Sequence, residues 1–267
     1  MKTDTSLLLH TTIGEGVVAF STTRHGGCGS GAYETFNCTP YTGDELAVVH
    51  ANQEKLCRYL DIPVERLVIP YQTHSCNILM VDDAFMQLSG DARHALLQDK
   101  DALITHLPEV CLCISTADCI PVLLYDREHK AIAAVHAGWR GTVNRLVEQT
   151  LQAMHEVYGT QGAQVDAVLG PGISVEAFEV GAEVYEAFEQ AGFDMQQMAQ
   201  WHEDKGKYHL DLLAANRMQL CAAGVPMTQI HDCGICTYTQ HRDFFSARRQ
   251  GIKSGRILNG ILITPNT

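Results

Sequence analysis

The sequence predicts one domain of mixed α/β class over residues 1–267. Segments with strand and helix patterns alternate loosely along the chain. The two strands expected within 110–139 look antiparallel, which favours mixed sheets over a purely parallel sheet. Hydrophobic residues make up 46% and charged residues 19% of the chain, a balance that supports a sizeable core. No repeat, low-complexity segment or Pro/Ser-rich linker divides the sequence, so we expect a single domain.

Strands are expected where apolar residues form short runs bounded by turn residues. The region 66–83 is expected to form two short strands broken around Gln72–Ser75, and 120–126 is expected to continue the strand at 110–116. Further strands are expected at 16–24, 101–105, 131–139, 163–169 and 257–264.

Apolar residues at helical spacing predict helices over 44–61, 143–159, 182–192 and 210–225. Thr142 is the expected N-cap of the second helix, without a capping box, because Glu148 lies outside the required spacing. Gly192 is expected at the C-terminal end of the third helix, and the fourth also ends at a glycine.

Composition and charge exclude several classes of function. The formal net charge is −12, and the densest basic cluster is Arg248, Arg249, Lys253 and Arg256, so we expect no nucleic acid polymer as partner. A small anionic substrate remains compatible with local arginines. The segment 1–16 is too polar for a signal peptide, and no apolar run is long enough to span a bilayer. We expect a cytoplasmic protein without a membrane partner, whose ten cysteines serve metal binding or catalysis before disulfides.

The strands at 120–126 and 131–139 predict a metal site. If Tyr125 pairs with Lys130 across the turn, the same register places Cys119 opposite His136. Directly opposite side chains in an antiparallel pair lie close together on one face, so the two can share one ion. His74, in a turn between two strands, is the best third ligand. Two histidines and one thiolate leave a fourth position open, as in catalytic zinc sites, where zinc activates water near neutral pH.

Several other patterns have both a functional and a plain structural interpretation. Cys233 and Cys236 form a C-x-x-C pattern near His241, which is either a metal or redox site or two unpaired thiols near a turn. The chain has no second C-x-x-C pair to complete four metal ligands. Cys111 and Cys113 face one side of a strand and are expected in the core. The glycine-rich loop after Arg24 either forms a tight turn or brings backbone amides to a phosphate. The helix start after Gly138, with Arg140, is a candidate anion site.

Specific motifs run along most of the chain, between about residues 20 and 258: TTRHGG, GAYETFN, YQTHS, DALIT, STADCIPVLLYD, AAVHAGWRG, GPGIS, FEVG, LDLLAANRMQL and CTYTQHRDFFSARRQG with GR. These motifs resemble those of the laccase-domain family, also described as multicopper polyphenol oxidase or purine nucleoside phosphorylase. The metal ligands of that family fall on His74, Cys119 and His136. The resemblance implies a single-domain α-β-β-α sandwich with mixed sheets, similar to the fold of putative cysteine hydrolases.

The resemblance also implies a zinc-dependent activity, with copper as the alternative metal. The implied reactions are phosphorolysis of adenosine, inosine and methylthioadenosine to free base and ribose 1-phosphate, and deamination of adenosine, by a monomer that binds nucleoside and phosphate. Cys119, His136 and Asp118 are the expected catalytic residues, and the general acid is left open between Asp118 and Cys119. The residues expected to bind substrate or phosphate are Arg24, Asn37, Gln72 and Arg140.

Departures from the family pattern at 35–37, 41–44 and 176–178 touch no metal ligand but leave the substrate preference open. Three alternatives to nucleoside chemistry remain. A hydrolase of peptidoglycan precursors would use Cys119 as nucleophile and His136 as base. A copper-dependent polyphenol oxidase fits less well, because the thirteen histidines include no His-x-His pair. A zinc-stabilised binding module would require four protein ligands.

Overall fold

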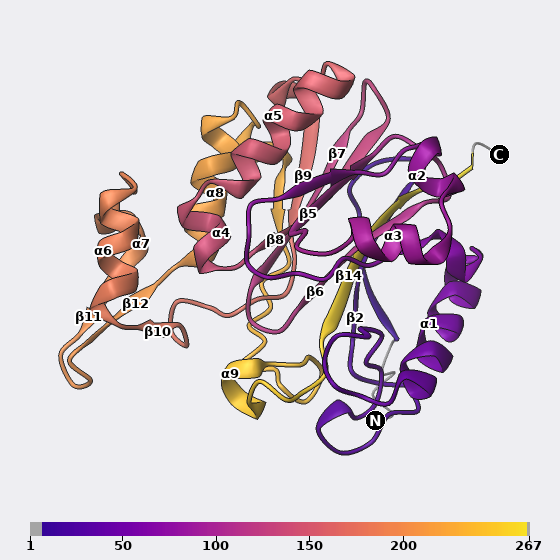
Figure 1. Ribbon diagram of the computed structural model, residues 1–267. Coiled ribbons are helices and arrows are strands. Elements are labelled where there is room, and N and C mark those ends of the chain that lie inside the picture. The colour runs from indigo at the N-terminus through magenta and orange to yellow at the C-terminus, as the bar shows by residue number, and fades with distance from the viewer. Residues whose placement is uncertain (1–6, 266–267) are drawn as a thin grey trace.

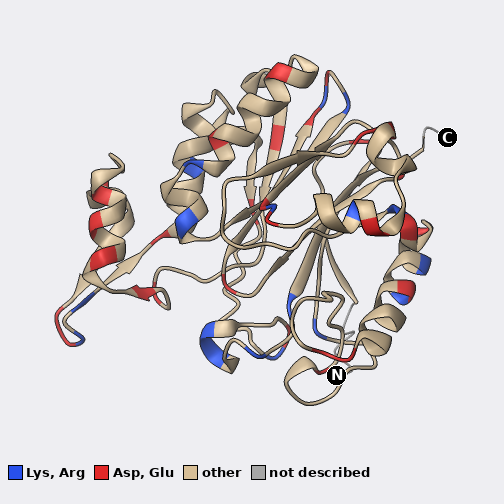
Figure 2. Ribbon diagram, in the orientation of Figure 1, with Lys and Arg blue, Asp and Glu red and all other residues tan. Residues whose placement is uncertain are grey.

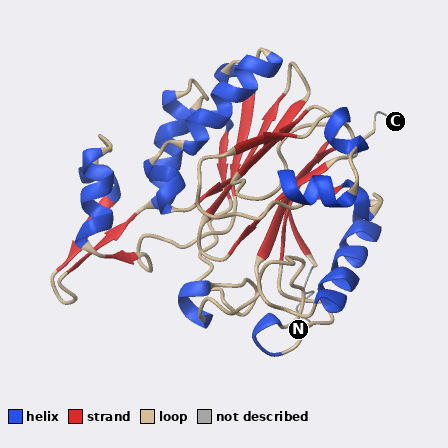
Figure 3. Cartoon of the chain, viewed as in Figure 1, coloured by secondary structure: helices blue, strands red, loops and turns tan. Residues whose placement is uncertain are grey.

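Two β-sheets pack face to face in the computed structural model, and helices cover their outer faces (Figure 1, Figure 3). The structure describes residues 7–265; the first residues of the N-terminal segment discussed above lie outside this range. The arrangement is an α-β-β-α sandwich with mixed sheets, which confirms the predicted fold class.

The first sheet has five strands in the order β1-β2-β14-β6-β3. Its β3–β6 pair is parallel and its other pairs are antiparallel. The strands are β1 (Leu8–Thr11), β2 (Val17–Thr22), β3 (Leu67–Val68), β6 (Cys111–Thr116) and β14 (Ile257–Ile263).

The second sheet has six strands in the order β13-β9-β7-β8-β5-β4. It is also mixed, because β13–β9 and β4–β5 are parallel while the central pairs are antiparallel. The strands are β4 (Ile78–Met80), β5 (Ala102–Thr105), β7 (Ile120–Asp126), β8 (Ala131–Ala137), β9 (Val165–Leu169) and β13 (Ile230–Asp232).

The core forms three layers around these sheets. Apolar side chains of both sheets, such as Leu112 and Leu123, meet in the central layer. Burying each such side chain stabilises the fold by roughly 1.5–3 kcal/mol. Helices α5 (Leu146–Tyr158) and α8 (Leu212–Ala222) cover the outer face of the six-stranded sheet. Helix α1 (Leu46–Leu60) covers the outer face of the five-stranded sheet.

Shorter elements complete the chain. Helices α2 (Asp83–Gln87) and α3 (Gly90–Leu96) connect β4 to β5, α4 (Trp139–Val143) follows β8, and α9 (Ala247–Gln250) precedes β14. A smaller sheet, ordered β10-β12-β11, projects from the body beside α6 (Ala182–Gln190) and α7 (Met195–Met198), as Figure 1 shows. Its strands are β10 (Glu179–Val180), β11 (Ala199–His202) and β12 (Lys207–Leu210).

Three local predictions are wrong. The segment 120–126 does not continue the strand at 110–116, because the chain leaves the five-stranded sheet after Thr116 and enters the other sheet at Ile120. Thr142 is not an N-cap, because α4 begins directly after Gly138 and a left-handed Arg145 separates it from α5. The third concerns the register of β7 and β8.

In that pair, His136 lies opposite Pro121 rather than Cys119. The last pair is Asp126 with Ala131, so the turn occupies the next four residues along the chain. The Asp126 carboxylate sets this turn by accepting hydrogen bonds from the backbone N–H groups of Glu128 (2.9 Å) and His129 (3.2 Å). Asp126 therefore precedes the turn as the last paired residue of β7, whereas the sequence pattern predicts it inside the turn.

Within residues 7–265, no helix combines the length and the apolar character needed to cross a membrane.

Candidate active site

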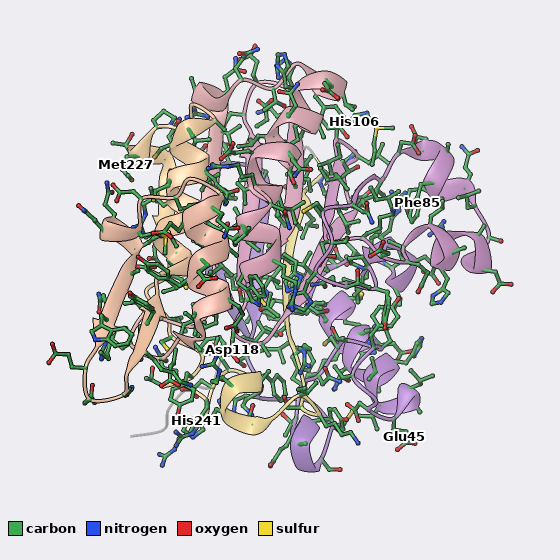
Figure 4. All side chains as sticks on the ribbon, turned by 60° about the vertical axis from the view of Figure 1, so that its left-hand side comes forward. Glu45, Phe85, His106, Asp118, Met227 and His241 are labelled. Atoms are coloured by element: carbon green, nitrogen blue, oxygen red, sulfur yellow. The ribbon has the colours of Figure 1, made fainter. Side chains whose placement is uncertain are left out.

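Cys119 lies where the chain crosses from one sheet to the other, between β6 and β7. Asp118 precedes it in a left-handed conformation with a φ of 91°. The Asp118 carboxylate accepts hydrogen bonds from Thr237 Oγ1 (2.7 Å), Ser246 Oγ (2.6 Å) and the backbone N–H of Arg248 (2.6 Å). Figure 4 shows Asp118 beside α9. The C-terminal segment therefore anchors the crossing that presents Cys119.

His136 lies near the end of β8 and is held by Asp101, the residue that precedes β5. Its Nδ1 lies 2.7 Å from Asp101 Oδ1, and its backbone N–H donates to the Asp101 carbonyl oxygen at 2.8 Å. With Nδ1 bonded to a buried carboxylate, the Nε2 atom of His136 is left for a metal or a substrate. A carboxylate behind a histidine is the common support of metal-binding imidazoles.

The same Asp101 carboxylate also shapes the turn that carries His74. It accepts backbone N–H groups of Thr73 (3.2 Å), His74 (3.1 Å) and Ser75 (2.7 Å). His74 itself adopts a positive φ of 63°. Burial would raise the pKa of Asp101, but the hydrogen bonds and charge of His136 and the hydrogen bonds of Ser75 hold that pKa below its usual range. One buried carboxylate thus positions both histidines.

The three predicted ligand residues meet in space. Cys119 Sγ lies 3.7 Å from His74 Nε2, the two imidazole rings are 4.8 Å apart between centroids, and one ligand atom from each residue lies within 4.8 Å of the others. A tetrahedral zinc ion with bonds of about 2.3 Å to sulfur and about 2.0 Å to nitrogen would separate these atoms by roughly 3.5 Å. The donor set and its spacing therefore fit a metal ion, and no second group of this kind occurs among residues 7–265.

The electrostatics of the site favour a metal ligand set. Removal of water raises the pKa of the Cys119 thiol, but the charge of His136 and hydrogen bonds from both histidines lower it to about 6. Desolvation lowers the pKa of His136, whereas the charge of Cys119 and the Asp101 hydrogen bond raise it to about 9. Without a metal, the thiolate and the imidazolium each stabilise the charged form of the other. A metal ion would take the place of the imidazolium proton, because metals bind deprotonated ligands.

Gly138 is a site residue that the sequence analysis named only as part of a helix start. A Cβ atom at this position would lie 2.8 Å from His74 Cδ2 and 3.0 Å from Cys119 Sγ. Its φ of −69° and ψ of 169° suit any residue, so the glycine is needed for space rather than for conformation. The backbone at Gly138 closes one side of the ligand group.

The ligand group opens into a cavity of about 410 Å³. His74, Cys119 and His136 all line it, so one side of the site faces open space. The remaining wall combines aromatic, apolar, hydroxyl and amide side chains with one arginine: Thr39, Tyr41, Thr42, Pro70, Tyr71, Gln72, Ser115, Ala117, Ala247, Ile252 and Arg256.

Of the four residues predicted to bind substrate or phosphate, the structure places only Gln72 in the cavity wall. Its side-chain Nε2 donates to the Ser115 carbonyl oxygen at 2.9 Å, and its Oε1 accepts from the Ser115 backbone N–H at 2.7 Å. Arg24 donates instead to the carbonyl oxygens of Glu34 (2.9 Å) and His241 (2.7 Å), so it joins two loops.

Asn37 and Arg140 also lie outside the cavity wall. Asn37 is fully buried, and its Nδ2 donates to Asp44 Oδ2 at 2.9 Å while its Oδ1 accepts from the Arg256 backbone N–H at 3.1 Å. Arg140 is exposed and stacks over Trp139, with 4.3 Å from Cζ to the ring centroid. Asp118, expected to be catalytic, likewise does not line the cavity. Its bonded carboxylate indicates a positioning role.

The other cysteine patterns do not join this site. Burial raises the pKa of Cys233 to about 11, and Cys236 Sγ accepts a hydrogen bond from the Ser174 backbone N–H at 3.4 Å. Neither belongs to a metal-ligating group in the described part of the chain. Cys111 and Cys113 are fully buried, with sulfur atoms 3.5 Å apart, which confirms their place in the core.

Comparison with known proteins gives the class of this fold and site. A family model described as "Multi-copper polyphenol oxidoreductase laccase" matches residues 18–264, and the chain belongs to this family. A protein of Bacteroides thetaiotaomicron named purine nucleoside phosphorylase is 55% identical over 244 residues, covering 91% of this chain and 90% of its own length.

Two further relatives extend the comparison. Adenosine deaminase RL5, from an unknown prokaryotic organism, is 43% identical over 250 residues, covering 92% of this chain and 94% of its own length. The crystal structure of YlmD from Geobacillus stearothermophilus superposes with a TM-score of 0.88 at 28% identity, covering 99% of this chain and 98% of that one. The resemblance seen in the sequence motifs is therefore confirmed, and relatives named as enzymes of nucleoside chemistry support an enzyme here.

Proposed function

We propose that this protein is a zinc-dependent purine nucleoside phosphorylase that also deaminates adenosine. The observation that carries the proposal is a His-Cys-His ligand group in the wall of a cavity of about 410 Å³. Adenosine, inosine and methylthioadenosine are the proposed nucleosides, and phosphate is the second substrate. The names of the two relatives above support both activities.

Zinc fits the donor set better than other metals. Two imidazoles and one thiolate with a side open to a cavity is the arrangement of a catalytic zinc site, whereas structural zinc has four protein ligands. Copper binds the same donors tightly, so it is a competing occupant. A multicopper oxidase needs several copper ions close together, and residues 7–265 offer one three-ligand group. Polyphenol oxidation is therefore the weaker candidate despite the family description.

Residues of this chain orient the proposed metal ligands and the purine for either reaction. When bound, zinc would supply Lewis acidity and activation of water near neutral pH. Asp101 holds the proton of His136 at Nδ1 and so fixes which nitrogen of that ring faces the cavity. The rings of Tyr41 and Tyr71, 5.0 Å apart and edge to face, line the cavity and offer apolar surface to a purine. When the nucleoside and its second substrate, phosphate or water, are held in one cavity, they react without first having to meet in solution.

A thiol hydrolase is the second candidate that a specific observation favours. Cys119, His136 and Asp101 are arranged in space as a nucleophile, a base and a carboxylate that orients the base. The Cys119 pKa of about 6 would make the thiol nucleophilic without metal. Peptidoglycan precursors are the substrate class for that alternative. The two candidates differ in their response to metal, because a bound ion occupies the thiolate.

The test is turnover by metal-depleted protein before and after zinc is restored. Adenosine with phosphate should yield adenine and ribose 1-phosphate, and adenosine without phosphate should yield inosine, only when zinc is present. Cys119→Ala should abolish both, whereas Cys221→Ala, which removes an exposed cysteine on α8, should leave both intact. Absence of product from zinc-loaded protein contradicts the proposal, and hydrolysis of peptidoglycan precursors that zinc suppresses favours the thiol hydrolase.

A further inference from the structure

Arg256 stands at the end of the segment that closes the cavity, directly before β14. The next residue, Ile257, pairs with Thr116, the last residue of β6 before the crossing that carries Cys119. Asn37 fixes the Arg256 backbone by accepting its N–H at 3.1 Å. Arg256 therefore enters the cavity wall from a position set by the same sheet that leads to Cys119.

The Arg256 guanidinium is held, but not by a carboxylate. Nη1 donates to the carbonyl oxygens of Ser254 (2.7 Å) and Gly255 (2.9 Å), and Nη2 donates to that of Ile252 (2.9 Å). These neutral acceptors hold the group without forming an ion pair with it. No ion pair of Arg256 with an acidic side chain occurs in the described part of the chain.

Part of the guanidinium also remains available for a ligand. A guanidinium carries five N–H donors. Nε and the second N–H of Nη2 have no hydrogen-bond partner among residues 7–265. Two free N–H donors on one guanidinium can bind oxygens of a phosphate or carboxylate.

Arg256 supplies the positive charge of the cavity wall. Burial lowers the pKa of Arg256, while the nearby charges of Cys119 and Asp118 raise it. No other lysine or arginine lines this cavity. A half-buried cation without a carboxylate partner is stabilised by an oxyanion ligand, because charge is costly away from water unless it is paired.

The other arginines near the site are directed elsewhere. Figure 2 shows basic residues on α9. Of these, Arg248 donates to the Glu179 carbonyl oxygen at 3.1 Å and Arg249 lies over the Tyr238 ring at 5.2 Å. Arg24 and Arg140 are occupied as described above. None of these four arginines lines the cavity.

We propose that Arg256 binds the phosphate substrate through the guanidinium N–H groups that have no partner in the described chain, in the cavity that the His-Cys-His group lines. This inference rests on the proposed phosphorolysis and names the residue that recognises its second substrate. Asn37 and the carbonyl oxygens of the 252–255 loop act as positioning groups, because they set the direction of the guanidinium.

Direct binding of inorganic phosphate to zinc-loaded protein tests this assignment without turnover. Isothermal titration calorimetry should show phosphate binding by the wild type and at least roughly tenfold weaker binding by Arg256→Gln, since a bidentate charged contact is lost. Arg256→Lys keeps the charge but not the paired donors and should give an intermediate loss. Lys253→Gln removes an exposed positive charge from the same loop and should bind phosphate as the wild type does.

Each outcome bears on a separate claim. Equal phosphate affinity of the wild type and Arg256→Gln, or no phosphate binding by the wild type, overturns the assignment. Binding of adenosine 5′-monophosphate that depends on Arg256, without binding of inorganic phosphate, overturns it as well. Binding that depends on Arg256 in a protein that performs no phosphorolysis upholds the phosphate site and contradicts the proposed function. Melting temperatures separate loss of binding from loss of folding, and Arg256→Lys carries the test if Arg256→Gln does not fold.

Discussion

Substitution of Gly138 by alanine tests whether the geometry of the ligand group is set by the backbone beside it. The added Cβ would lie 2.8 Å from His74 Cδ2 and 3.0 Å from Cys119 Sγ. Carbon atoms in contact normally stand about 3.5–4.0 Å apart, so the two ligands must retreat by at least about 0.7 Å and 0.5 Å. Metal–ligand distances tolerate deviations of only about 0.2 Å. We therefore expect zinc affinity to fall by at least the roughly 10–100-fold seen when groups that orient ligands are changed.

The fold should tolerate this change, because the backbone angles of Gly138 suit alanine. Competition of metal-depleted protein with a chromophoric zinc chelator measures the affinity, and thermal denaturation without zinc measures the stability. Gly90→Ala is the matched control, because a Cβ at Gly90 would meet nothing within 4 Å. Wild-type zinc affinity in Gly138→Ala would refute the claim that this backbone defines the site.

Three further substitutions test other parts of the structure. Asp101→Asn should weaken zinc binding about 10–100-fold and lower the free energy of unfolding by about 3 kcal/mol, since His136 loses its buried partner; unchanged chelator competition would show that Asp101 orients neither histidine. Asp118→Asn should cost about 1.5–3 kcal/mol in urea unfolding, because an amide cannot accept all three hydrogen bonds, while zinc stoichiometry stays at one; a fall in kcat with unchanged stability and KM would instead make Asp118 catalytic. Burial would raise the pKa of Asp126, but the hydrogen bonds that it accepts lower it, so its contribution to stability is present above the ordinary carboxyl pKa of about 4 and is lost as the pH falls through the folded-state pKa. The stability difference between the wild type and Asp126→Asn should therefore be about 1.5–3 kcal/mol at pH 7 and shrink below about pH 4, and a difference independent of pH would contradict this.

The sequence predicted the meeting of His74, Cys119 and His136 better than it predicted the strands that carry these residues. The register of β7 and β8 is shifted by two residues, so His136 lies diagonal to Cys119 rather than opposite. Side chains alternate between faces with a period of two, and a shift of two leaves both on the same side. The expected meeting of Cys119 and His136 therefore survived an error in the pairing that led to it.

The residues that support the ligands were missed because their partners are distant along the chain. Asp101 contacts His136 through the pairing of β5 with β8, which sequence patterns do not reveal. A charged residue directly before the apolar strand Ala102–Thr105 was the available signal. Arg256 was noted only as part of a basic cluster, and its link to Asn37 spans 219 positions. Such contacts follow from the order of the strands in each sheet. Many strand orders are possible for a chain that passes from one sheet to the other at residues 117–119.

Zinc K-edge X-ray absorption of the reconstituted protein tests the central claim most directly, because it counts the atoms bound to the ion. The account predicts one sulfur at about 2.3 Å and three nitrogen or oxygen atoms at about 2.0 Å, of which two are imidazole nitrogens and one comes from solvent. In Cys119→Ala the sulfur should disappear. A wild-type spectrum without sulfur, or with four protein ligands, would contradict an open His74–Cys119–His136 site.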